Sequence, residues 1–166
     1  MDIESMAWRV IEKYWKLIVP VDVHEIARRM KITIVSDPFL PVSGEFSLEE
    51  KNRPLIRSNT SENPLRQKFT LAHALGHYLL HAGNQPFFHL ARERVVAWQM
   101  EHQAWDFAFE LFIPRTALVR LMRTSWNDAD LREHFQVSEE FFIRRMQAFS
   151  EESAGRAGPT LSDIEI

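Results

Sequence analysis

Residues 69–81 read FTLAHALGHYLLH, and this stretch determines the architecture that we expect. Asn63 followed by Pro64 forms an N-cap and a first helical residue ahead of it. Apolar residues then recur every three or four positions, as is typical of a helix: Leu65, Phe69, Ala72, Leu75 and Leu79. The sequence therefore predicts a helix over 63–81 that stops at Gly83.

Two histidines lie on one face of this helix. His73 and His77 are four residues apart, so their imidazoles lie about one helical turn apart. Two such rings can bind one zinc ion at roughly 2.0–2.1 Å from each nitrogen. Two histidines at this spacing are also common as ordinary core or surface residues, which is the alternative interpretation.

The pentapeptide His73-Ala74-Leu75-Gly76-His77 differs by one residue from the motif H-E-x-x-H. In that motif the histidines hold a metal, and the glutamate takes a proton from the metal-bound water. Ala74 occupies the position of the glutamate. The sequence therefore predicts a metal site without its general base, with a rate lower by at least roughly 10²–10⁴-fold.

Two further residues of the helix support a packed site. Gly76 costs roughly 0.5–1 kcal/mol relative to alanine inside a helix, which is useful where another segment approaches the backbone closely. His81 continues the row of histidines but lies too far along a straight helix to share the same ion. We expect His81 to pack beside the ligands or to orient them.

The third ligand is expected on a second long helix, predicted over about 92–113 and stopped by Pro114. Glu101 and Gln103 lie on opposite flanks of its apolar stripe, each roughly 80° from the centre, so amphipathicity does not choose between them. A carboxylate binds divalent cations better than a neutral amide does, which favours Glu101. The alternative is that Glu101 is an ordinary solvated glutamate.

Composition limits the class of protein. The chain has 166 residues, 45% of them hydrophobic, which suffices for a folded domain. It has no cysteine, so disulfides and cysteine-ligated metals are excluded. A net charge of −3 does not indicate a surface that binds nucleic acid. No signal peptide and no apolar run of about 18 residues is present, so we expect a cytoplasmic protein that does not cross a membrane.

Shorter elements complete the chain. We predict helices over 4–18 and 22–30, short strands at 32–35, Phe46 and 55–57, and three helices within 115–149. The segment from 150 to 166 is rich in small and acidic residues, and we expect a flexible tail there.

Two stretches together resemble the ImmA/IrrE metallopeptidases. Residues 69–81 are similar to the family's signature helix, in which Ala74 would normally be Glu. Residues 101–114 resemble its second block, where a Glu is followed three residues later by Ala and then by a Phe-Ala pair. Members vary between Glu and Gln at the position of Gln103, while Glu is steadier at that of Glu101. Weaker similarities extend the likeness over roughly residues 6–148.

The resemblance implies an α+β fold with a zincin-like core, a small short-stranded sheet, an active-site helix and a C-terminal helical bundle. We assign the core to 1–114, the bundle to 115–149 and the tail to 150–166. The implied ligands are His73, His77 and Glu101, for zinc or another divalent ion such as manganese. The implied activity is cleavage of a helix-turn-helix repressor, which derepresses phage, mobile-element or stress genes.

Ala74 divides two hypotheses of function. In the first, the chain is a metallopeptidase inactivated by a Glu-to-Ala substitution within an otherwise complete site. In the second, it is a non-catalytic pseudopeptidase that binds a transcription factor or antitoxin without cutting it. Both imply a protein partner rather than direct contact with nucleic acid.

Three other features have ordinary alternatives. Phe87, Phe88 and His89 fall in a predicted loop near the metal and are candidates for a substrate groove or for a loop packed on the core. Residues 127–149 resemble a helix-turn-helix. However, six Arg against five acidic residues over 115–149 is too even a balance for a DNA reader, and a packing bundle is favoured. Arg144-Arg145 is interpreted as a solvated helix face.

Overall fold

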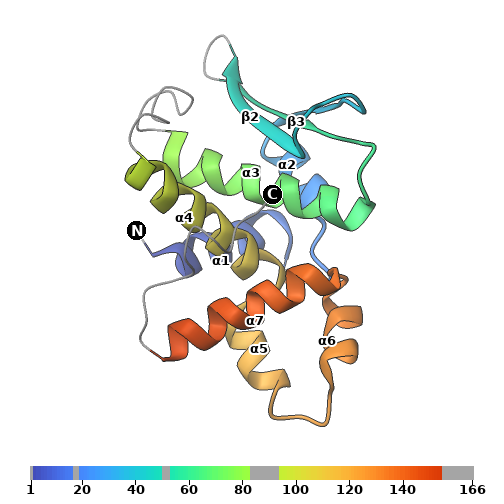
Figure 1. Cartoon of the computed structure of the whole chain (residues 1–166), viewed down its shortest axis with the longest axis vertical. Helices are drawn as coiled ribbons and strands as arrows, with labels where there is room; N and C mark the ends of the chain where they lie inside the picture. The colour runs from blue at the N-terminus through green and yellow to red at the C-terminus, as the bar shows by residue number, and fades with distance from the viewer. Residues whose placement is uncertain (1, 17–18, 50–52, 83–93, 155–166) are drawn as a thin grey trace.

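A computed structural model shows a mixed α+β protein with seven helices and one small sheet among the described residues, which are 2–16, 19–49, 53–82 and 94–154 (Figure 1). The elements in chain order are α1 Ile3–Tyr14, α2 Val23–Arg29, β1 Thr33–Ser36, β2 Gly44–Glu49, β3 Arg53–Ser58, α3 Pro64–His81, α4 Arg94–Phe112, α5 Arg115–Leu121, α6 Asp128–Phe135 and α7 Glu139–Ser153.

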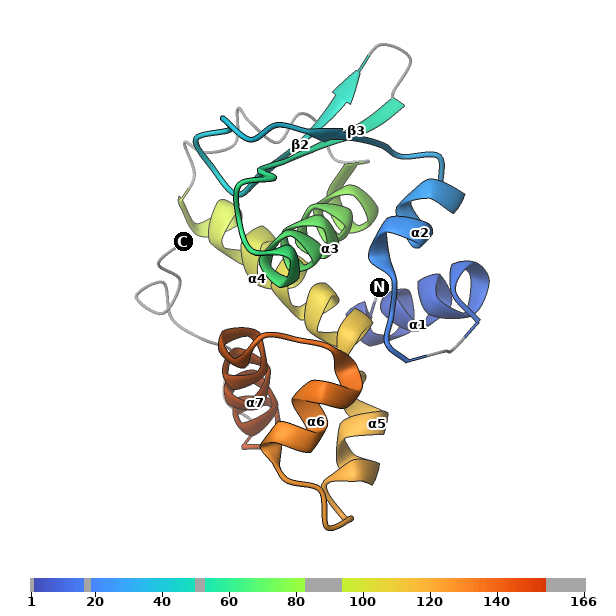
Figure 2. The same ribbon diagram turned by 90° about the vertical axis from the view of Figure 1, so that its right-hand side faces the viewer.

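The three predicted strands are confirmed and form one sheet in the order β1-β3-β2. β3 pairs parallel to β1 and antiparallel to β2, which aligns Ile56 with Ile34 and with Phe46. Ile56 and Phe46 are buried, so this face of the sheet contributes to the core. Figure 2 shows the sheet lying across α3.

Helix α3 lies at the centre of the molecule. It begins as the sequence predicts, with the Asn63 side chain accepting a hydrogen bond from the Leu65 N–H and with Pro64 at its first position. α4 packs along one side of α3, α2 contacts it as well, and α1 packs mainly on α4 (Figure 2). The centre of the fold is therefore the α3–α4 pair.

Gly76 sits where the two long helices meet. A Cβ atom at this position would lie 3.0 Å from the carbonyl oxygen of Ala104 and 3.1 Å from its Cα. Both are backbone atoms of α4, so the neighbour cannot simply rotate away. This confirms the expectation that Gly76 allows another segment to approach, and the approach brings the side chains of α3 and α4 within reach of each other.

The first helix is shorter than expected. It ends at Tyr14 rather than near 18. Lys16 has a φ of 69°, in the left-handed region, and its N–H bonds to the carbonyl of Ile11. A left-handed residue directly after a helix ends it, and apolar periodicity does not reveal that.

The three predicted C-terminal helices are α5, α6 and α7. Asn127 and Asp130 form a reciprocal capping box at the start of α6, and the Ser138 hydroxyl accepts from the Phe141 N–H at the start of α7. Each cap therefore satisfies a backbone N–H in the first turn of its helix. α7 runs four residues past the expected bound at 149, to Ser153, while 155–166 lie outside the described residues.

The interpretation of Arg145 as solvated was wrong. Its side chain is 1% exposed and pairs with Glu110 of α4. The guanidinium also donates to the Ile113 carbonyl at 3.2 Å and contacts Glu152 at 3.3 Å. Arg145 shares a helical face with buried Phe141, Phe142 and Ala148. This ion pair links α7 to α4.

Within the described ranges, no helix has both the length and the apolar character needed to cross a bilayer.

Candidate metal centre

The α3–α4 pair brings His73, His77 and Glu101 together. The Nε2 atoms of His73 and His77 lie 3.2 Å and 3.1 Å from the two carboxylate oxygens of Glu101. One donor atom from each of the three residues lies within 4.8 Å of the others. Among the described residues this is the only such group of histidine and acidic side chains.

The two histidines of the group are more buried than Glu101. The imidazoles of His73 and His77 are 17% and 15% exposed, whereas the Glu101 carboxylate is 42% exposed. A small molecule or a peptide group can therefore approach the cluster from the side of α4.

The donor atoms converge on a shared point. His73 Nε2 is buried and has no hydrogen-bond partner in the described chain, although a carboxylate oxygen lies 3.2 Å away. The nitrogen and the carboxylate oxygen are both possible ligands of a cation at this position. A buried polar atom left without a partner is costly, and a cation at that position would satisfy it.

The protonation states suit a cation. Burial lowers the pKa of His73, so the ring is neutral and keeps a lone pair. Burial alone would raise the pKa of Glu101, but its contacts with His73 and His77 outweigh burial and hold it well below the usual range. Two imidazoles and one carboxylate are a common donor set for a catalytic zinc ion.

Ala74 follows the first histidine and is buried at 6% exposure. Its methyl group offers no proton acceptor to the cluster. The described part of the centre thus contains a complete set of donor atoms and no general base at the position next to His73.

His81 and Gln103 form a second, connected layer. His81 is 4% exposed. Its Nδ1 lies 3.3 Å from Nδ1 of His77, and its Nε2 lies 2.9 Å from Oε1 of Gln103. Burial lowers the pKa of His81, which keeps this ring neutral as well. Gln103 lies on the opposite flank of α4 from Glu101. It is nevertheless connected to the site, because His81 links it to His77.

Aromatic rings pack against one side of the centre. Trp105 lies 5.1 Å from the His73 ring and 4.4 Å from Phe69, measured between centroids. The sequence analysis did not single out Trp105, although it follows Glu101 by one helical turn and so shares its face of α4. The ring limits how far the His73 imidazole can tilt.

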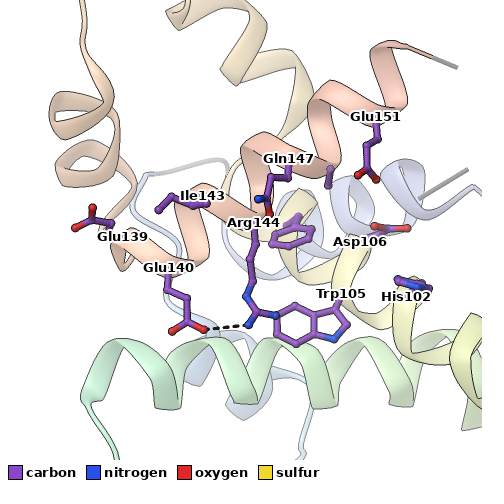
Figure 3. Close-up of a pocket in the computed structure, with 11 residues that line it drawn as sticks. His102, Trp105, Asp106, Glu139, Glu140, Ile143, Arg144, Gln147 and Glu151 are labelled. Atoms are coloured by element: carbon purple, nitrogen blue, oxygen red, sulfur yellow. Dashed lines mark hydrogen bonds and ion pairs between the residues drawn. The ribbon is translucent and has the colours of Figure 1, made fainter. Parts of the chain in front are cut away.

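A groove of about 610 Å³ runs between α4 and α7, beginning at Trp105 and His102 (Figure 3). Arg144 lies over the Trp105 ring at 5.3 Å and pairs with Glu140 at 3.1 Å. Arg144 therefore has specific partners and is not the purely solvated residue expected. Four acidic residues line the groove: Asp106, Glu139, Glu140 and Glu151.

Two acidic side chains at the His102 end of the groove, Asp106 and Glu151, are partly buried (Figure 3). Burial, together with the nearby carboxylates of Glu152 and Glu110, raises the pKa of Asp106 to about 6. One oxygen of Glu151 is buried without a hydrogen-bond partner among the described residues. Phe87, Phe88 and His89, expected to line a substrate groove, lie outside the described residues.

Comparisons with known proteins agree with this geometry. A sequence model of the IrrE N-terminal-like domain matches residues 27–147, which include α3, α4 and the whole donor set. The chain belongs to the ImmA/IrrE family. It is 34% identical over 93 residues to the metallopeptidase ImmA of Bacillus subtilis, a match that covers 55% of this chain and 54% of that protein.

One solved structure has a similar fold. A transcriptional regulator of Mycobacterium tuberculosis superposes with a TM-score of 0.61 at 18% identity, over 88% of this chain and 47% of that one. At this identity the similarity concerns the fold alone. The chain spans about half the length of both relatives.

Proposed function

We propose that this chain is a metallopeptidase scaffold of the ImmA/IrrE type whose His73, His77 and Glu101 bind one divalent ion. Zinc is the expected ion and manganese an alternative, since a site of two imidazoles and one carboxylate accepts either. The observation that carries the proposal is the convergence of three donor atoms within 4.8 Å, one of them buried and without a hydrogen bond.

In the proposed centre, the ion would polarise a peptide carbonyl and lower the pKa of a coordinated water. His73 and His77 would supply nitrogen donors from the buried side, and Glu101 would supply a negative charge from the more exposed side. Trp105 packs against the His73 ring, and Phe69 packs against Trp105, which limits the tilt of the His73 imidazole.

We further propose that Ala74 leaves the scaffold unable to cut efficiently. A glutamate directly after His73 would place a proton acceptor beside the centre, and a methyl group cannot take that role. The ligands are retained while the base alone is missing, which favours an inactivated peptidase over a scaffold that has lost its whole site.

The proposed partner is a helix-turn-helix repressor. One relative is named as a metallopeptidase and the other as a transcriptional regulator, which supports a link between proteolysis and transcription. DNA-binding proteins carry basic surfaces, and the groove beside Trp105 is lined by four acidic side chains, of which Glu140 pairs with Arg144 and Glu139 with Arg132. In this arrangement a zincin-like core at 1–114 would hold the metal, and the bundle at 115–149 would form the other wall of the groove.

A non-catalytic regulator is the second candidate. The observation that favours it is Ala74 itself, since a protein that only binds its partner needs no base. In this case the same groove would hold a transcription factor or antitoxin without cleavage.

The decisive experiment compares the parent chain with Ala74→Glu and Ala74→Gln. Each purified protein is incubated with zinc and with the helix-turn-helix repressors encoded beside its gene, with and without chelator. We expect Ala74→Glu alone to cleave a repressor, at least about 10²-fold faster than the other two. Cleavage by none of the three, with the parent still binding a repressor, would favour the non-catalytic regulator.

A further inference from the structure

His81 connects the candidate metal centre to the surface of α4. It is buried, yet each of its ring nitrogens faces another side chain: His77 at 3.3 Å and Gln103 at 2.9 Å. Gln103 itself is an exposed residue. An exposed amide is thus linked to an expected metal ligand through one buried ring.

The contact between the two histidines restricts their tautomers. A neutral imidazole carries one N–H, so two ring nitrogens can hydrogen-bond only if one donates and the other accepts. In one arrangement His77 Nδ1–H donates to His81, and His81 Nε2–H donates to the Gln103 oxygen. His77 Nε2 then keeps a lone pair that points toward Glu101.

The reverse arrangement blocks the centre. If His81 Nδ1–H donates to His77, the proton of His77 must sit on Nε2, where it faces the Glu101 oxygen 3.1 Å away. His81 Nε2 then has to accept a proton, which Gln103 supplies after its amide rotates by half a turn. A ring nitrogen that carries a proton cannot bind a metal ion.

We propose that Gln103 is a positioning residue that sets the tautomer of His77 through His81. The proposal rests on the proposed metal centre. The amide of Gln103 can both accept and donate, so it serves both arrangements. A carboxylate at 103 accepts only, which fixes the arrangement in which His77 Nε2 carries no proton. A thioether or an aliphatic group at 103 fixes neither.

The test substitutes Gln103 by Glu and by Met, and measures zinc affinity by competition with a chromophoric chelator. We expect Gln103→Met to weaken binding by about 10-fold, near the lower end for residues that orient a ligand, because the contact lies at the surface. Gln103→Glu should bind at least as tightly as the parent.

Gln99 supplies the matched control. It is an exposed glutamine on the same helix, one turn before Gln103. Gln99→Glu adds the same charge to α4, and Gln99→Met removes the same amide. Both Gln99 variants should bind zinc as the parent does. Equal effects at 99 and 103 would assign the change in zinc affinity to charge or to helix stability, and would overturn the proposed role of Gln103.

Histidine nitrogen shifts in NMR spectra report the tautomers directly. In the metal-free Gln103→Glu protein we expect His77 to be protonated at Nδ1 and His81 at Nε2. The metal-free parent should populate the reverse pair to a greater extent, and zinc should move it to the first. Identical tautomers in metal-free parent, Gln103→Glu and Gln103→Met would overturn the proposal.

Failure of the two proposals gives different results. A parent that binds no zinc overturns the metal centre, while the metal-free spectra still decide whether Gln103 sets the tautomers. If the parent binds zinc and the Gln103 variants bind it as the Gln99 controls do, only the proposed role of Gln103 is overturned.

Discussion

Helix α4 carries two partly buried glutamates that have opposite surroundings. Glu110 meets the buried guanidinium of Arg145 and also accepts from the Arg115 N–H at 3.0 Å, so its oxygens are satisfied. Glu101 meets the imidazoles of His73 and His77, and His73 has a buried nitrogen without a hydrogen-bond partner among the described residues. The satisfied cluster joins parts of the fold, whereas the unsatisfied one has room for a ligand.

The difference shows how two charged clusters on one helix can be told apart. A buried ion pair that fills all of its hydrogen bonds needs nothing further. A cluster of two imidazoles and a carboxylate, with a buried nitrogen left over, can instead bind a cation that satisfies this nitrogen. Substitutions in the two clusters should therefore affect different measurements.

Removing a donor from the Glu101 cluster should have the largest effect on metal binding. We expect His73→Ala, His77→Ala or Glu101→Ala to abolish zinc binding by a dialysed sample, measured by elemental analysis and titration. Thermal unfolding of the metal-free Glu101→Ala protein should change little, because this side chain is 42% exposed, whereas His77→Ala also loses the contact with His81. Unchanged zinc affinity in both histidine variants would rule out the site.

Breaking the ion pair of Glu110 and Arg145 should lower stability and leave zinc affinity unchanged. Arg145→Met leaves a buried carboxylate without its cation and should lower the free energy of unfolding by about 3–5 kcal/mol, measured by urea denaturation. Zinc affinity at temperatures where the protein remains folded should not change.

The double variant Glu110→Leu, Arg145→Met is the control for that prediction. It removes both charges, so its loss of stability should be smaller than that of Arg145→Met alone. A larger loss in the double variant would mean that the Glu110 and Arg145 side chains contribute by packing rather than as a pair.

Asp106 extends the comparison, because it lies between the two glutamates in the sequence of α4 and forms no ion pair within the described residues. Its folded pKa of about 6 lies above the ordinary value of 3.8. The folded state therefore favours the protonated form, and the cost of ionisation appears as pH rises from about 4 to 6. Asp106→Asn should stabilise the protein at pH 7 by up to about 3 kcal/mol.

Thermal unfolding measured from pH 3.5 to 8 tests the sign of that effect. The difference between Asp106→Asn and the parent should vanish below about pH 4, where both side chains are neutral. A stabilisation that is equally large at pH 3.5 would show that ionisation of Asp106 is not its cause.

Much of the fold could be predicted because its signals are local. Asn63 caps the helix that follows it, as expected, and the same kind of local cap is made by Asp22, Asn127 and Ser138. The three strands also appear near their predicted positions. The end of α1 was missed, since it depends on the left-handed backbone of Lys16. Arg145 was misassigned because its charge was given more weight than its place on the apolar face of α7.

The sequence by itself determined the donor types of the proposed site and its missing base. Four-residue spacing places His73 and His77 on one face of any helix, and Ala74 cannot accept a proton in any fold. The rest was decided by the crossing of α3 and α4 at Gly76. That contact brings Glu101 to His73 and His77, links Gln103 to His81, and places Trp105 against the His73 ring. Helical periodicity fixes which residues share a face, but only the packing of two helices fixes which faces meet.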